Sequence, residues 1–391
     1  MAFSERMKTI ITAVRLLTPT EVIEHPVVVV EDERIVALGA RDHIVVPDGA
    51  RHHDFPDKIL APGFIDVHIH GGSGHDVMEV NPSALAAIER GMVKHGVTSY
   101  LPTTVTAPLP DTLRSLEHLG KVIRIASDNA GRSRPLCIHL EGPFISHAKR
   151  GVHPPQNLLP PSPETLRGLY QAAGGTVSML TIAPELDGGL ETIADAVSLG
   201  IHVSLGHSNA TLFEANAGID AGARHATHTF NAMRPLDHRE PGILGAILSD
   251  DCVTADLIAD GLHVAPGVIK LFFRMKGIDR AVLITDAISA TGMPDGKYKL
   301  GGFEVEVKGD RCDLDGKLAG SVLTLDRAIR NVMGFASLTL ANAIRLVTLN
   351  PARLVGVSHA HGTLAPGRVA DVVVLTPSGE VVATMVAGQF A

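Results

Sequence analysis

The middle of the chain alternates short apolar stretches with amphipathic ones, and this alternation limits the possible folds more than any other feature. Segments with apolar residues at helical spacing fill most of the intervals, at residues 82–94, 190–199, 211–221 and 266–276. Eight apolar segments are expected to be strands, at residues 63–69, 98–104, 136–140, 178–182, 202–205, 225–228, 253–258 and 281–285. Repeated strand–helix units give a parallel α/β sheet covered by helices.

Eight such units in about 250 to 300 residues predict a (β/α)8 TIM-type barrel. A doubly wound open sheet is the alternative architecture. It is disfavoured because no G-x-G-x-x-G follows the first strand, where a dinucleotide-binding sheet carries it. A glycine-rich, β-like insertion at residues 297–320 follows the last predicted strand.

Both ends of the chain have the pattern of short strands separated by turns. Runs of β-branched and apolar residues occupy 10–16, 27–30 and 34–38 near the start, and 370–375 and 381–386 near the end. We therefore expect a small β-sandwich domain built from both termini. The predicted boundaries are 1–60 for its first part, 61–361 for the barrel and 362–391 for its second part.

Composition restricts the partners and the compartment. Lys and Arg number 34 against 42 Asp and Glu, and this net charge of −8 disfavours nucleic acid while leaving room for a small anion. No uncharged apolar run reaches the roughly 20 residues of a membrane span, so we expect no membrane partner. Three widely spaced cysteines without a C-x-x-C pair indicate a reducing, cytoplasmic setting.

Metal-ligating side chains recur where the predicted barrel strands end. His68 and His70 lie two residues apart and so share one face of the first strand. Four further side chains follow the third, fifth, sixth and eighth strands: Glu141, His207, His228 and Asp286. Catalytic groups of such barrels sit at the C-terminal ends of the strands, and imidazoles with carboxylates suit zinc or another divalent first-row metal.

Longer motifs give the chain a resemblance to a known family. Residues 62–71, PGFIDVHIHG, resemble the first-strand signature of the amidohydrolase superfamily. NPARL at 350–354 and GTLAPGRVAD at 362–371 resemble the return of that family's chain to its small sheet domain. Segments 139–144, 206–208, 229–233, 260–263 and 285–287 resemble the branch that deacetylates amino-sugar phosphates.

The resemblance implies a role for each matching residue. It gives Glu141, His207 and His228 as the principal metal ligands and Asp286 as the catalytic aspartate. It gives His153, Asn231, the backbone of Ala232, Arg239 and His263 as substrate-binding groups. Family members supply the arginine across a subunit interface, which implies a homodimer. His68 and His70 make a second metal per subunit possible, with zinc, iron, cobalt or manganese as candidates.

The implied reaction removes the acetyl group from N-acetyl-D-glucosamine 6-phosphate, with metal-activated water and Asp286 as general base and then general acid. Two alternatives remain open from the residues: an amidohydrolase acting on a cyclic amide or on adenine, and a non-catalytic barrel scaffold. Many superfamily relatives bridge two metals with a lysine after the fourth strand. Residues 178–185 contain none, so Glu141 would supply the bridging carboxylate.

Overall fold

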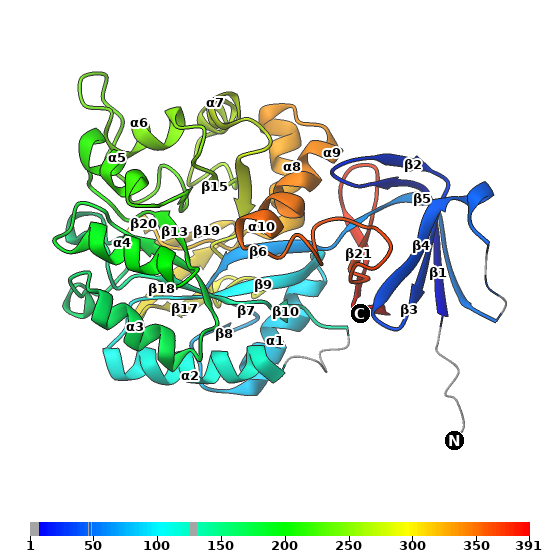
Figure 1. Cartoon of the computed structure of the whole chain (residues 1–391), viewed down its shortest axis with the longest axis horizontal. Helices are drawn as coiled ribbons and strands as arrows, with labels where there is room; N and C mark the ends of the chain where they lie inside the picture. The colour runs from blue at the N-terminus through cyan, green and yellow to red at the C-terminus, as the bar shows by residue number, and fades with distance from the viewer. Residues whose placement is uncertain (1–7, 46, 48, 126–130) are drawn as a thin grey trace.

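The computed structural model describes residues 8–45, 47, 49–125 and 131–391. It has a large α/β body and a smaller all-β body beside it, and the small one contains segments from both ends of the chain (Figure 1). The first seven residues of the predicted small domain lie outside the described part.

A curled parallel sheet forms the large body. Seven strands belong to one sheet, in the order β10-β9-β11-β12-β13-β14 with β6 paired to β9, and β15 pairs with β16 in parallel beside it. The strands are β6 (Phe64–Ile69), β9 (Val97–Thr104), β10 (Arg134–Pro135), β11 (Ile138–Glu141), β12 (Val177–Ile182), β13 (His202–Leu205), β14 (His225–Ala226), β15 (Ala255–Ile258) and β16 (Ala281–Ile284).

Helices follow the strands and cover the outside of the curled sheet (Figure 1). They are α1 (Pro82–Val93), α2 (Leu109–Ile125), α3 (Pro163–Ala172), α4 (Gly189–Ser198), α5 (Leu212–Asp220), α6 (Gly242–Ser249), α7 (Pro266–Lys276), α8 (Leu325–Ala336), α9 (Leu340–Val347) and α10 (Leu349–Leu354). Local sequence explains several starts. Asn81 caps α1 ahead of Pro82, Ser162 caps α3, and Thr211 with Glu214 forms a capping box on α5.

The small body is one mixed sheet in the order β23-β22-β21-β5-β1-β3-β4, with β2 paired to β1. Its strands are β1 (Lys8–Leu17), β2 (Val22–Glu24), β3 (Pro26–Glu31), β4 (Arg34–Ala40), β5 (Arg51–Pro62), β21 (Val372–Leu375), β22 (Val381–Val386) and β23 (Gln389–Phe390). The antiparallel pairing of β5 with β21 joins the two ends of the chain, as the sequence predicts.

Two small antiparallel sheets complete the large body. β7 (Gly71–Gly72) pairs with β8 (His75–Asp76) directly after β6. The predicted insertion is a four-stranded antiparallel sheet of β17 (Gly296–Leu300), β18 (Phe303–Lys308), β19 (Arg311–Leu314) and β20 (Lys317–Leu318). Short 3-10 turns occupy Arg41–His43, His147–Lys149 and Pro155–Asn157.

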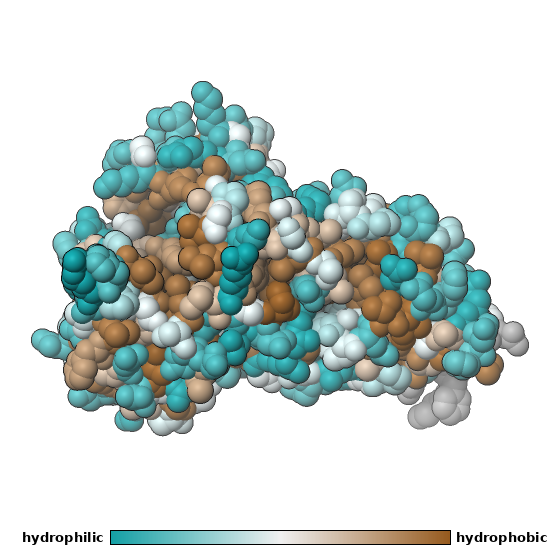
Figure 2. All heavy atoms as spheres, turned by 90° about the horizontal axis from the view of Figure 1, so that it is seen from above, coloured by the Kyte–Doolittle hydropathy of each residue, from teal (hydrophilic) through white to brown (hydrophobic). Residues whose placement is uncertain are grey.

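Burial follows the expected pattern. Every residue of β6, β9, β11, β15 and β16 is buried, because these strands have apolar partners on both faces. Hydrophilic residues dominate the outline of the molecule, while apolar ones gather toward the middle of the visible face (Figure 2). Among the described residues, no helix combines the length and apolar character needed to cross a bilayer.

Candidate metal centre and active site

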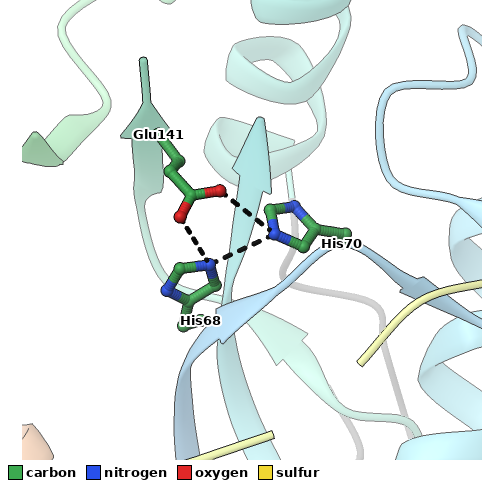
Figure 3. A group of neighbouring side chains, drawn as sticks. All are labelled: His68, His70 and Glu141. Atoms are coloured by element: carbon green, nitrogen blue, oxygen red, sulfur yellow. Dashed lines mark hydrogen bonds and ion pairs between the residues drawn. The ribbon is translucent and has the colours of Figure 1, made fainter. Parts of the chain in front are cut away.

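Six side chains predicted from strand ends converge at one pole of the curled sheet. His68 and His70 come from β6 and the residue after it, and Glu141 ends β11. The other three, His207, His228 and Asp286, each lie two residues beyond the end of a strand, after β13, β14 and β16. Figure 3 shows the carboxylate of Glu141 facing both rings of the first pair.

Glu141 occupies the centre of the group. Its Oε1 lies 3.1 Å from His207 Nε2 and 3.0 Å from His228 Nε2. The same oxygen is 3.4 Å from His68 Nε2, and Oε2 is 3.3 Å from His70 Nε2. One carboxylate therefore faces the four predicted histidine ligands, the arrangement expected of a bridging ligand.

Asp286 approaches the same group from the side of β16. Its Oδ1 lies 3.1 Å from His70 Nε2 and 3.6 Å from His68 Nε2. The Nε2 atoms of those two histidines are themselves 3.2 Å apart. Asp286 is thus placed beside the cluster and not at its centre.

The backbone is strained where the functional side chains leave the strands. His207, His228, Ala232 and Asp286 all have positive φ, at 48°, 32°, 50° and 50°. Such left-handed conformations cost non-glycine residues on the order of 1–3 kcal/mol each and gather at functional sites. Their recurrence at three strand ends indicates that the fold holds these residues against a local conformational preference.

Second partners fix the ring orientation of two histidines. Nδ1 of His70 lies 3.0 Å from the carbonyl oxygen of Thr103, and Nδ1 of His207 lies 2.8 Å from that of Lys149. A carbonyl oxygen only accepts, so each Nδ1 carries the hydrogen and donates it. Each Nε2 then directs a lone pair into the cluster, as a metal ligand requires.

His153 has the opposite arrangement. The backbone N–H of Thr106 donates to its Nδ1 over 3.2 Å, so this nitrogen is the acceptor. In the neutral ring Nε2 must then carry the hydrogen, and it lies 3.3 Å from Glu141 Oε2. Burial lowers the pKa of His153 to about 4, which keeps the ring neutral. Although His153 lies close enough to Glu141 and His207 to share an ion, this tautomer makes it a donor.

Electrostatics keep both carboxylates ionised. Burial raises the pKa of Asp286, but His70 and His68, when protonated, outweigh it through the hydrogen bond from His70 and through their charges and bring the pKa to about 2. Burial also opposes ionisation of Glu141, yet the surrounding histidines hold its pKa well below the usual range. The hydrogen bond to Glu141 overcomes burial at His228 and raises its pKa to about 9. Two buried negative charges among imidazoles favour a cation.

The donor set fits a divalent metal. His68, His70 and Glu141 bring their ligand atoms within 4.8 Å of one another. Nε2 of His207 and Nε2 of His228 are 3.0 Å apart. Ligands bound at about 2.0–2.1 Å in a tetrahedron lie roughly 3.3 Å apart, which matches these spacings. The buried Nδ1 atoms of His68 and His228 have no hydrogen-bond partner among the described residues.

Four acidic residues without a predicted role hold the cluster and the neighbouring strand ends in place. Asp66 accepts from Thr285 Oγ1 over 2.6 Å and from the His68 backbone N–H over 3.3 Å. Asp256 accepts from the backbone N–H of His228, and Asp260 Oδ2 lies 2.6 Å from His263 Nδ1. Glu185 accepts from Ser208 Oγ beside His207, over 2.7 Å. Of these, Asp66 and Asp260 lie within the motifs at 62–71 and 260–263, whereas no motif includes Asp256 or Glu185.

A pocket of about 290 Å³ opens above the cluster. Its lining includes three of the predicted substrate-binding residues besides His153, namely Asn231, Ala232 and His263. Lys149 also lines it and had no predicted role. Arg239 does not line it and is exposed, on a loop where its backbone N–H donates to Asp237 Oδ1 over 2.8 Å.

Comparisons with known proteins agree with this geometry. The model of the Amidohydrolase family matches residues 59–391. An N-acetylglucosamine-6-phosphate deacetylase from Bacillus subtilis is 34% identical over 98% of this chain and 96% of its own. An N-acetylgalactosamine-6-phosphate deacetylase from Escherichia coli O157:H7 is 39% identical over 85% of this chain and 88% of its own.

A solved structure is similar over almost the whole chain. It is a mutant N-acetyl-D-glucosamine-6-phosphate deacetylase from Mycobacterium smegmatis, with an aspartate changed to alanine, in complex with N-acetyl-D-glucosamine-6-phosphate. The TM-score is 0.91 at 36% identity, covering 98% of this chain and 99% of the other.

Proposed function

This chain belongs to the amidohydrolase family, and we propose that it hydrolyses N-acetyl-D-glucosamine 6-phosphate to glucosamine 6-phosphate and acetate. The observation that carries this function is the convergence of Glu141, His207, His228 and Asp286 beneath one pocket, in a chain whose near-full-length relatives are sugar-phosphate deacetylases. A cyclic-amide or adenine hydrolase and a non-catalytic scaffold gain no support from these relatives.

We propose that Glu141, His207 and His228 hold a divalent metal, zinc first among the candidates, with His68 and His70 available for a second. When bound, such an ion polarises an amide carbonyl and lowers the pKa of a water molecule from 15.7 to about 7. Iron, cobalt and manganese accept the same nitrogen and oxygen ligands.

Asp286 is assigned the proton transfers. An ionised carboxylate beside the cluster can take a proton from the attacking water as its oxygen bonds to the acyl carbon. The same carboxyl then gives that proton to the sugar nitrogen as the carbon–nitrogen bond breaks. The products are acetate and the free amine.

The remaining pocket residues are assigned to substrate binding. Asp260 orients the His263 ring, whose other nitrogen can donate to the oxygen on which negative charge develops. His153 offers its Nε2–H, Asn231 its side-chain amide and Ala232 its backbone N–H. Lys149 adds a positive charge at the pocket for an anionic substrate.

Arg239 is assigned to the phosphate of a substrate bound to a second copy of the chain. Its own pocket does not include it, and the loop that carries it is exposed. Leu236, which is 55% exposed, precedes Arg239 by three residues. Phe213, which is 82% exposed, follows Leu212, whose backbone N–H donates to Glu240 Oε1 over 2.8 Å. Exposed apolar side chains of this size support a subunit interface, and hence the homodimer.

We further infer that the curled sheet closes into a (β/α)8 barrel. Backbone hydrogen bonds support closure on both sides of the β15–β16 pair. Asp286 N donates to His68 O over 3.0 Å and His70 N to Ala287 O over 2.8 Å, while Thr229 N donates to Asp256 O over 3.0 Å. The eight barrel strands would be β6, β9, β11, β12, β13, β14, β15 and β16.

The small body is inferred to be a β-sandwich with the boundaries predicted above, residues 1–60 and 362–391 around a barrel at 61–361. Buried side chains from distant strands of its sheet, such as Val30, Ile35, Val374 and Met385, share one apolar cluster. Ile35 N also donates to Arg368 O over 3.0 Å. A flat sheet could not bring these strands together. Cys137, Cys252 and Cys312 are free thiols, in keeping with a cytoplasmic setting.

The direct test is acetate release by the purified protein from N-acetylglucosamine 6-phosphate, beside N-acetylgalactosamine 6-phosphate and unphosphorylated N-acetylglucosamine. We expect turnover of the first substrate and a much lower kcat/KM for the unphosphorylated sugar. A higher kcat/KM for the galactosamine compound would reassign the sugar in favour of the second relative's activity. No acetate from any of them would refute the function.

A further inference from the structure

The pocket has an apolar side that the reaction as described above does not use. Four of its lining residues, Val105, Val152, Leu300 and Ala319, also belong to or pack against the apolar core under the β17–β20 sheet. We call these four residues the apolar wall. Three of them are almost fully buried, with exposed fractions of 3% for Val105 and 2% each for Leu300 and Ala319.

The wall is closely packed and lies next to the catalytic aspartate. A Cβ added at Gly301 would come within 2.9 Å of Val105 Cγ1, so the β17–β18 turn packs directly on Val105. A Cβ at Gly320 would lie 3.1 Å from Leu300 Cδ2 and 3.7 Å from the carbonyl oxygen of Asp286. The backbone N–H of Ser321 donates to that same oxygen over 2.9 Å. The small sheet is thus tied to the strand end that carries Asp286.

The polar side of the pocket comes from other strand ends. Asn231 and His263 follow β14 and β15, and Lys149 is bonded through its carbonyl to His207 after β13. Val105 follows β9, and Leu300 and Ala319 come from the sheet that follows β16, while β9 and β16 flank β6. Val152 lies in the loop after β11 and reaches the same core. The metal-ligating cluster takes residues from the strand ends of both sides, with Asp286 after β16 and His207 and His228 after β13 and β14.

A secondary amide is planar and strongly prefers the trans form, so its acyl substituent and its nitrogen substituent point in opposite directions. If the amide carbon lies at the cluster and the sugar phosphate extends toward Lys149 and Asn231, the acyl methyl group faces the opposite side. That side is the apolar wall, where a methyl group gains from burial and a longer chain would meet close-packed side chains.

We propose that the apolar wall, with Leu300 as its largest member, sets the length of the acyl group that this enzyme removes. This inference rests on the proposed function, because it assumes that an N-acyl sugar phosphate occupies the pocket. Leu300 and Val152 are then specificity-determining residues, and the β17–β20 sheet helps to select the acyl group of the substrate.

The test compares kcat/KM for N-acetyl- and N-propionylglucosamine 6-phosphate in the wild type, Leu300→Ala and Val152→Ala. One additional methylene in a hydrophobic pocket changes discrimination by roughly 10- to 200-fold. We expect the wild type to favour acetyl by at least about 10-fold, and Leu300→Ala to raise the propionyl-to-acetyl ratio by about 10-fold. Val152→Ala, whose side chain is only partly buried, should raise it in the same direction and decides the matter if Leu300→Ala does not fold.

Leu314→Ala is the matched control, because Leu314 packs on the same core without lining the pocket. Its propionyl-to-acetyl ratio should equal that of the wild type. If the wild type is active but Leu300→Ala and Val152→Ala keep its propionyl-to-acetyl ratio, the role of the apolar wall in selecting the acyl group is refuted and the proposed function stands. If the wild type does not hydrolyse the acetyl substrate, both the proposed function and the role of the apolar wall are refuted.

Discussion

At the scale of single residues, identical side chains have different roles because their second hydrogen-bond partners differ. His70 and His207 donate through Nδ1 to carbonyl oxygens, which leaves Nε2 free to ligate. His153 accepts a backbone N–H at Nδ1, so its Nε2 is a donor. A histidine count or a His-x-His motif could not distinguish these roles, since the partners lie far away in sequence.

Asp286→Asn tests the proton transfers. The amide preserves shape and hydrogen bonding but cannot take a proton from water, so kcat should fall by about 10²- to 10⁴-fold, the usual contribution of general acid–base catalysis. Metal content, measured by elemental analysis, should remain that of the wild type. Asp220→Asn, an exposed change on α5, should keep full activity. A near-normal rate for Asp286→Asn would remove the carboxylate from the mechanism.

At the scale of elements, the strands with all-buried apolar runs were predictable to within about two residues. β13 runs over the predicted residues 202–205, and β6 begins one residue after the predicted 63. β14 was predicted to reach 228 but ends at Ala226, because His228 leaves the ladder with positive φ. The functional requirement thus overrides the local preference at that strand end.

Other elements had no clear periodic signal. α6 is almost entirely apolar and contains two glycines, so neither spacing nor propensity marks it as a helix. The residues that position the cluster were equally hidden. Asp66 and Thr285 are separated by 219 positions, and only the paired ends of β6 and β16 bring them together.

Asp66→Ala tests this strand-end support. Removing a buried acceptor leaves Thr285 Oγ1 and two backbone N–H groups without their partner, at a cost of about 1–3 kcal/mol in the free energy of unfolding. Because these groups belong to His68 and to Thr285, the residue before Asp286, kcat should fall as well. Thr285→Val, which removes one of these bonds and keeps Asp66, should lose less stability. Equal stability of Asp66→Ala and wild type in urea unfolding would contradict the assignment.

At the scale of the whole molecule, the small sheet is joined to the large body through buried charge. Arg134 of β10 lies 3.3 Å from the carboxylate of Asp371, just before β21. That carboxylate also lies 3.1 Å from His361 Nδ1 and accepts from the backbone N–H of Ala387 over 2.9 Å. Burial raises the pKa of Asp371, but these partners outweigh it and keep the pKa below its usual value.

A depressed pKa contributes stability above the unfolded pKa of about 3.9, and that stability is lost as pH falls through the folded pKa. Asp371→Asn should therefore lower the free energy of unfolding at pH 7 by about 3 kcal/mol, since it leaves the half-buried Arg134 without its charge partner and the Ala387 backbone N–H with a weaker acceptor. The difference from wild type should shrink below pH 4. If urea unfolding gives the same difference in the free energy of unfolding at pH 7 and at pH 3, the charge of Asp371 does not contribute to stability.

Subunit mixing tests the assembly. Arg239→Ala should raise KM for the phosphorylated substrate and leave the unphosphorylated sugar almost unaffected. If Arg239 serves the neighbouring subunit, randomly mixed dimers of Arg239→Ala and Asp286→Asn contain some intact sites, and activity should recover to about a quarter of the wild-type value. No recovery after exchange would place the arginine in its own subunit's site or outside the site.

The central claim is that Glu141, His207 and His228 share one divalent cation beside Asp286. Anomalous diffraction from crystals of metal-loaded protein, collected on both sides of the metal's absorption edge, locates that ion directly. We predict an anomalous peak within about 2.0–2.3 Å of a Glu141 oxygen and the Nε2 atoms of His207 and His228. A fully loaded protein whose peak lies elsewhere, with these three side chains bound to no ion, would contradict the account.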